Sequence, residues 1–161
     1  MTETTAEARA PAGPVGLGGW LILPMFGLFA SPLVGVAQIL TYPEIGAAWP
    51  YLTAGQAAFV VTELVLNVAL VFIAPAVLLY FMFKRLQMFP GWYMIWLAVS
   101  PIYLIADALV GYAIFPQVSA AGANELFDKE TTRSIARLII YAAIWIPYTM
   151  RSERVANTFT R

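Results

Sequence analysis

Long apolar segments alternate with short polar connections along this chain. Four such segments run over about 20–40, 57–83, 91–115 and 134–150. A bilayer core about 30 Å thick requires roughly 20 apolar residues in a helix that crosses it. The runs are continuous and lack the alternation of a barrel strand. The pattern predicts an all-α membrane protein in which four transmembrane helices occupy residues 17–150.

Proline occurs in every predicted span, at Pro24, Pro32, Pro75, Pro101 and Pro147. In a soluble helix these residues would argue against the assignment, because proline removes a backbone hydrogen bond. Membrane helices tolerate proline because neighbouring helices satisfy the freed carbonyl groups. We therefore expect neighbouring spans to supply donors at these places.

The connections predict the topology. Residues 84–90 are too few for anything but a tight turn, so the second and third spans form an antiparallel hairpin within an antiparallel bundle. This turn contains Lys84 and Arg85, and the segment 151–161 contains three arginines. The connection 41–56 has no basic residue, and that after the third span has two. The positive-inside rule therefore predicts that both termini are cytoplasmic.

The two terminal segments are expected to lie outside the bundle. Residues 1–16 are polar and begin with acidic rather than basic residues, unlike a signal peptide, so we expect a disordered cytoplasmic segment and an uncleaved first span. Residues 151–161 are expected to form a basic cytoplasmic tail.

Composition supports a membrane location and excludes several chemistries. Hydrophobic residues make up 61% of the 161 residues and charged residues 11%, against about 45–50% and 25% in globular proteins. Basic and acidic residues balance at nine each, which gives no indication of nucleic acid binding. The absence of Cys and His excludes disulfides, thiolate chemistry, His-ligated haem, Ser–His catalysis and the usual zinc sites. We expect no catalytic residue, metal or cofactor.

Small residues recur every four positions in the first span, at Gly27, Ser31 and Gly35. Such a stripe lets two membrane helices approach closely. It predicts either packing against another span of the same chain or the seam of a homodimer.

Polar residues within the predicted spans form the most informative set: Glu63, Asn67, Asp107 and Arg137. Because the spans alternate in direction, we expect these residues to meet in the outer third of the bilayer. An unpaired charge at the membrane centre costs about 2.5–3.5 kcal/mol, so such residues usually find partners. One interpretation is a clamp in which Arg137 pairs with a carboxylate; the other is a proton or ion relay.

Two stretches resemble a known family. Residues 18–24 read GGWLILP, and residues 144–148 read IWIPY, followed by SERV at 152–155 and by Thr158 and Phe159. They are similar to the opening and closing motifs of the bacterial domain-of-unknown-function family 2569. The resemblance implies a small four-helix protein of the bacterial inner membrane and almost nothing about activity. It also places Glu63, Asp107 and Arg137 where the family carries such residues.

The closing motif has a physical interpretation of its own. Trp145 and Tyr148 are expected at the inner interface as anchors of the last span, and Pro147 is expected to bend its last turn. Arg151 and Arg154 are expected to face anionic headgroups. The alternative is a tail that docks to a partner.

These observations favour a non-enzymatic accessory or interaction subunit of a larger inner-membrane complex. The alternative is a small homodimeric proton-coupled transporter or channel that uses Glu63, Asp107 and Arg137. A third class is a lipid-binding protein with a cavity opened by prolines and small residues. The expected partners are the lipid bilayer and either a larger membrane complex or a second copy of the chain.

Overall fold

The structure, a computed structural model, describes residues 13–39, 43–116 and 127–160, and this part of the chain is helical with no strand. The elements in chain order are η1 (Gly19–Leu21), α1 (Ile22–Ile39), α2 (Pro43–Ala48), η2 (Trp49–Tyr51), α3 (Ala54–Val68), η3 (Ala69–Ile73), α4 (Ala74–Lys84), α5 (Met88–Ile114), α7 (Lys129–Arg151) and α8 (Glu153–Thr158). The elements α3, η3 and α4 form one continuous helix, and η3 is a π-helical segment within it.

In the described part of the chain, three helices are long and apolar enough to cross a membrane: Gly19–Val36, Ala54–Lys84 and Met88–Ile114. They correspond to the first three predicted spans. The fourth predicted span lies in α7, which has 23 residues but is not among the helices that meet this criterion. All-helical architecture and membrane-spanning helices are therefore confirmed for the described residues, whereas the count of four is not.

Capping residues explain why two helices begin earlier than the apolar pattern predicts. The Thr53 hydroxyl accepts a hydrogen bond from the Gln56 backbone N–H, and the Thr53 backbone N–H donates to the Gln56 side chain, so α3 begins at Ala54. Asp128 accepts a hydrogen bond of 2.6 Å from the Thr131 backbone N–H at the start of α7. That bond also holds the pKa of the Asp128 carboxyl below its ordinary value.

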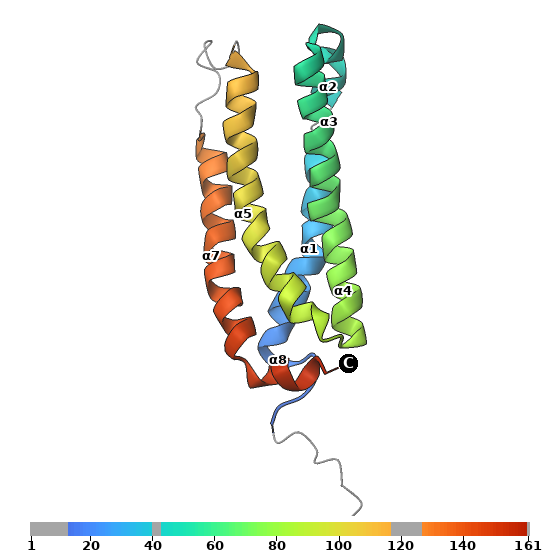
Figure 1. Ribbon diagram of the computed structural model, residues 1–161, viewed down its shortest axis with the longest axis vertical. Helices are drawn as coiled ribbons and strands as arrows, with labels where there is room; N and C mark the ends of the chain where they lie inside the picture. Colours follow the sequence, from blue (N-terminus) through green and yellow to red (C-terminus); the bar gives the residue numbers. More distant parts are fainter. Residues whose placement is uncertain (1–12, 40–42, 117–126, 161) are drawn as a thin grey trace, which may run out of the picture.

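The helices lie in two pairs, α1 beside α3–α4 and α5 beside α7 (Figure 1). The pairs meet at the end that holds the α4–α5 turn and α8, and they lie apart at the other end. There, long side chains connect them: the Gln56 side-chain amide donates to the Ile114 carbonyl at 3.3 Å. The hydrophobic core is therefore concentrated at the end with the turn and α8.

Pro75 lies just after η3, and neighbouring helices satisfy the carbonyl groups that it leaves without donors. Proline has no N–H, so it removes the donor of the Leu70 carbonyl in the π-helical register, in which Ala74 bonds to Ala69, and that of the Val71 carbonyl in the α-helical register. The Ser31 hydroxyl of α1 donates to the Val71 carbonyl at 3.2 Å, and the Trp96 indole N–H of α5 donates to the Leu70 carbonyl at 2.9 Å. The expectation that other spans supply donors holds at this proline.

The C-terminal segment differs from the expected tail. It forms the short helix α8, and Val155, Thr158 and Phe159 are buried. Thr158 accepts a hydrogen bond of 2.9 Å from the Gly16 backbone N–H, and Phe159 stacks on Phe89 with ring centroids 4.5 Å apart. The segment therefore closes one end of the bundle, because its apolar face finds buried partners there.

The N-terminal prediction concerned residues 1–16, of which 1–12 lie outside the described residues. Gly16, at the end of that range, is held by its bond to Thr158.

Candidate functional site

Two of the predicted polar residues face each other between α3 and α5. The Tyr103 hydroxyl donates to the backbone carbonyl of Glu63 at 3.3 Å. Asp107 lies one turn further along α5 on the face of Tyr103, and its carboxylate is near enough to that of Glu63 for the two to interact electrostatically. Asn67 lies one turn from Glu63, and Glu63, Asn67 and Asp107 are all only half-buried.

Arg137 does not join these carboxylates, so the prediction that it meets Glu63, Asn67 and Asp107 in one cluster is wrong. The Arg137 side chain is exposed on α7, and no ion pair joins it to Glu63 or Asp107 in the part of the chain that the structure describes. The reason is the relative height of the helices. Figure 1 shows α7 beginning well below the upper end of α5, so that counting residues from helix ends places Arg137 too high.

The exposed position of Arg137 leaves both the clamp and the relay without their positive charge. An arginine clamp requires contact between Arg137 and a carboxylate, which the structure does not have. The relay hypothesis used Arg137 as the counter-charge of Glu63 and Asp107. Among the described residues, no group of three or more His, Cys, Asp or Glu side chains is placed so that it could hold a metal ion.

The small-residue stripe of α1 faces other helices of the same chain. A Cβ atom at Gly27 would touch the Tyr141 hydroxyl of α7. The Ser31 hydroxyl bonds to Val71, and a Cβ at Gly35 would lie 2.5 Å from Val71 Cγ1 and 2.8 Å from Phe72 Cζ. The stripe thus contacts α7 at one end and η3 over the rest of its length.

The closing motif is divided between the core and the surface. Trp145 is 6% exposed, so its ring packs inside the bundle, in contact with Tyr148 at a centroid distance of 5.3 Å. This differs from the expected interfacial anchor, because Trp145 belongs to the hydrophobic core of the bundle. Pro147 and Arg151 are exposed, and α7 continues through Pro147 to Arg151.

Arg154 packs against the opening motif. Its guanidinium Cζ lies 3.5 Å from the position that a Cβ at Gly19 would occupy, and Gly18 is close to the same side chain. Gly19 has φ +63°, a conformation that favours glycine. The two motifs that carry the family resemblance are thus in direct contact.

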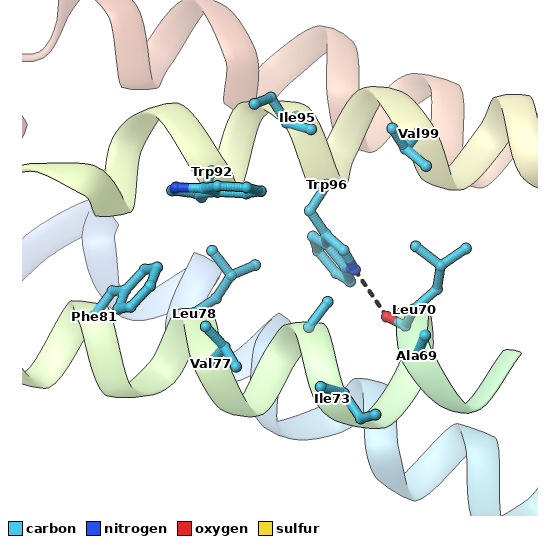
Figure 2. A pocket seen from close by; sticks show the side chains of 11 residues that line it. Ala69, Leu70, Ile73, Val77, Leu78, Phe81, Trp92, Ile95, Trp96 and Val99 are labelled. Carbon is cyan, nitrogen blue, oxygen red and sulfur yellow. Dashed lines mark hydrogen bonds between the residues drawn. The ribbon is translucent and has the colours of Figure 1, made fainter. Parts of the chain in front are cut away.

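A groove that the sequence analysis did not identify lies on the outer side of the α4–α5 hairpin. It has a volume of about 260 Å³ and is lined by apolar side chains of η3, α4 and α5. Figure 2 shows Phe81 and Trp92 at one end and Trp96 reaching from α5 to η3 at the other. The small residues Ala69 and Ala74 also line it.

The sequence held a signal for this groove. Trp92 and Trp96 are four residues apart, and they therefore share a face of α5. The small side chains of Ala69 and Ala74 leave space opposite them. Neither pattern alone indicates a groove, because the pairing of the two helix faces depends on the hairpin register.

The bond between Trp96 and Leu70 leads to a prediction about stability. Trp96→Phe keeps an aromatic ring in the groove but removes the donor, so we expect the free energy of unfolding to fall by about 0.6–1.7 kcal/mol, from the average to the maximum found for hydrogen bonds between membrane helices. Thermal unfolding in detergent measures the change. Trp92→Phe, which alters a lining indole with 52% exposure, is the control. Equal losses in the two variants would show that the bond to Leu70 contributes nothing specific.

Comparison with known proteins confirms the family resemblance. The family model described as "Protein of unknown function (DUF2569)" matches residues 14–160. The chain is also similar to inner membrane protein YdgK of Escherichia coli strain K12, with 28% identity over 167 aligned residues that cover 99% of this chain and 98% of that protein. No solved structure matches the chain. Together with the three apolar helices, these similarities show that the chain is a multi-pass inner-membrane protein and that it belongs to the DUF2569 family of bacterial membrane proteins of unknown function.

Proposed function

We propose that α7 is a fourth membrane span and that both termini are cytoplasmic. α7 packs against α5 more extensively than any other pair of described elements does, and its buried residues Ala142, Trp145 and Thr149 occur at helical spacing. The α4–α5 turn, with Lys84 and Arg85, lies at the same end as α8 (Figure 1). The positive-inside rule favours a cytoplasmic position for that end.

We further propose that the protein is a non-enzymatic interaction subunit of a larger inner-membrane complex. The observation that carries this proposal is the exposed Arg137 near the middle of α7. It lies 14 residues from Arg151, which is roughly 21 Å along a helix. In a span this position is within the hydrocarbon core, where an arginine without a partner is costly. A carboxylate from another membrane protein would remove that cost.

The position of Arg137 on α7 also indicates where the partner would bind. Arg137 lies one turn before Tyr141, which contacts Gly27 of α1, so Arg137 is on the flank of α7 that turns toward α1. The two helix pairs lie apart toward the end opposite α8 (Figure 1). A partner helix with an acidic side chain at this depth would fit this charge.

Purification of the tagged protein at native expression level in mild detergent, followed by mass determination of the intact complex, tests the proposal. We expect a stoichiometric membrane partner that is lost from Arg137→Gln and retained in part by Arg137→Lys. Arg133→Gln, one turn earlier on α7 and also exposed, is the matched control and should retain the partner. The unfolding temperature of Arg137→Gln alone should not fall, because no hydrogen bond or ion pair joins the Arg137 side chain to another described residue.

The decisive measurement is a charge exchange. Arg137→Glu should lose the partner, and a reciprocal acid-to-arginine change in that partner should restore the complex. A partner that binds Arg137→Gln as well as wild type, or a wild-type protein that purifies alone, would overturn the proposal.

A further inference from the structure

The groove on the α4–α5 hairpin is open toward the outside of the bundle. The lining side chains at its rim are exposed, among them Ile73 at 56%, Val77 at 43% and Ile95 at 53%, whereas Leu78 on its floor is buried. In Figure 2 the two helices flank the hollow from either side. Because the helices that line it are apolar and long enough to span a membrane, the groove faces the lipid phase.

Its volume indicates what kind of group fits. The hollow of about 260 Å³ lies between η3 and α4 on one side and α5 on the other, and its lining side chains are aliphatic or aromatic. A single flexible hydrocarbon chain fits a narrow hollow with apolar walls, and the bilayer supplies such chains at high concentration.

One end of the groove has positive charge. Lys84 lies three residues after the lining residue Phe81 and seven after Val77, so it continues the groove face of α4 toward the turn. Arg85 follows at the left-handed C-cap, with φ 56°. Both side chains are exposed, and the turn through Pro90 contains no acidic residue. An anionic headgroup attached to a chain in the groove would therefore meet two basic side chains.

The end opposite the turn is fixed by a hydrogen bond. The Trp96 indole is held to the Leu70 carbonyl at 2.9 Å, and this bond exists because Pro75 leaves that carbonyl without a helical donor. The ring therefore has one orientation in which its face borders the hollow (Figure 2). A wall that is already ordered lowers the entropic cost of binding a flexible chain.

We infer that this groove is a binding site for an anionic phospholipid, with one acyl chain between Trp92 and Trp96 and the phosphate at Lys84 and Arg85. The site is separate from Arg137, which lies on α7, so the inference does not depend on the proposed partner. A charged site of this kind selects among lipids by headgroup, whereas an ordinary lipid-facing surface does not.

Native mass spectrometry of the purified full chain tests the inference. The protein is delipidated and then exposed to an equimolar mixture of phosphatidylglycerol and phosphatidylcholine with identical acyl chains. We expect one retained phosphatidylglycerol per chain and little phosphatidylcholine. Removing the charges in Lys84→Gln/Arg85→Gln should lower the phosphatidylglycerol preference about fivefold for each residue. Arg151→Gln, an exposed basic residue at the same end of the bundle but outside the groove, should not change it.

A second pair of variants tests the position of the acyl chain. Ala74→Phe should fill the groove and abolish retention of either lipid, whereas Ala76→Phe, on an exposed position outside the lining, should not. Val77→Trp, at the exposed rim, makes the same test if Ala74→Phe does not fold. Equal retention of both lipids by wild type would overturn the headgroup assignment. Lipid retention by the filled variants would overturn the acyl-chain site. Displacement of the lipid from the groove by a helix of another protein would overturn it as well.

Discussion

Replacing Phe159 with alanine is expected to lower the free energy of unfolding by about 3–5 kcal/mol, the usual cost of removing a buried aromatic ring. Phe159 is 5% exposed, and its ring stacks on that of Phe89. It lies at the end of the bundle, beyond the apolar helices, so that unfolding of this end transfers the ring to water. The hydrophobic effect therefore contributes fully to the loss of stability. It would contribute little for a ring that passes from a protein contact into lipid. Chemical unfolding in detergent micelles, followed by tryptophan fluorescence, measures the loss.

The control is the same substitution at Phe26, whose side chain is 69% exposed on the apolar helix α1. Its ring is surrounded by lipid or detergent both before and after unfolding, so Phe26→Ala should cost much less. If the two variants lost equal stability, the closed end of the bundle would not be a structural element, and the C-terminal residues would behave as the free tail that their composition suggests.

The bilayer makes the helical framework of this protein predictable. Its thickness fixes the length of each apolar run, and local capping explains the remaining shifts at helix ends. The Thr53–Gln56 capping box and the N-cap Asp128 are residue types that can be recognised in the sequence. They make α3 and α7 begin a few residues before the apolar segments. These features depend on residues within one turn of each other, which is why sequence alone can place them.

Features that depend on the relative height of helices could not be predicted in the same way. The sequence predicts Arg137 beside Glu63 and Asp107 because the spans alternate in direction and each residue lies in the outer part of its predicted span. The structure places the start of α7 well below the end of α5 (Figure 1), and no pattern within the helices fixes that offset. The exposed position of Arg137 is the result.

Long-range pairing accounts for the other differences. The buried residues of this segment are Val155 and Thr158 of α8 and Phe159 just after it, and three positions are too few to indicate packing. Thr158 bonds to Gly16, 142 residues away. Likewise, Pro75 predicts that carbonyls need donors, but nothing local identifies Ser31 and Trp96 as those donors. The groove depends on that second donor and on the register of the hairpin.

Replacing Gly35 with leucine is expected to destabilise the chain by about 1–3 kcal/mol or more, because the side chain would overlap two neighbours. Even its Cβ would lie within 3 Å of Val71 and Phe72, and Val71 cannot turn away easily since its side chain is β-branched. If the new side chain pushed α1 away from η3, the hydrogen bond from Ser31 to the Val71 carbonyl would also weaken. Gly91→Leu is the matched control: apart from its chain neighbours and its own helix backbone, no atom lies within 4 Å of a Cβ at Gly91, and the change should raise stability slightly through helix propensity. The unfolding midpoint and the mass of the particle, measured together, distinguish the two predicted roles of the stripe. A loss of stability in a monomer indicates contact within the chain, whereas unchanged stability with loss of a dimer would show that Gly35 lies at a seam between copies.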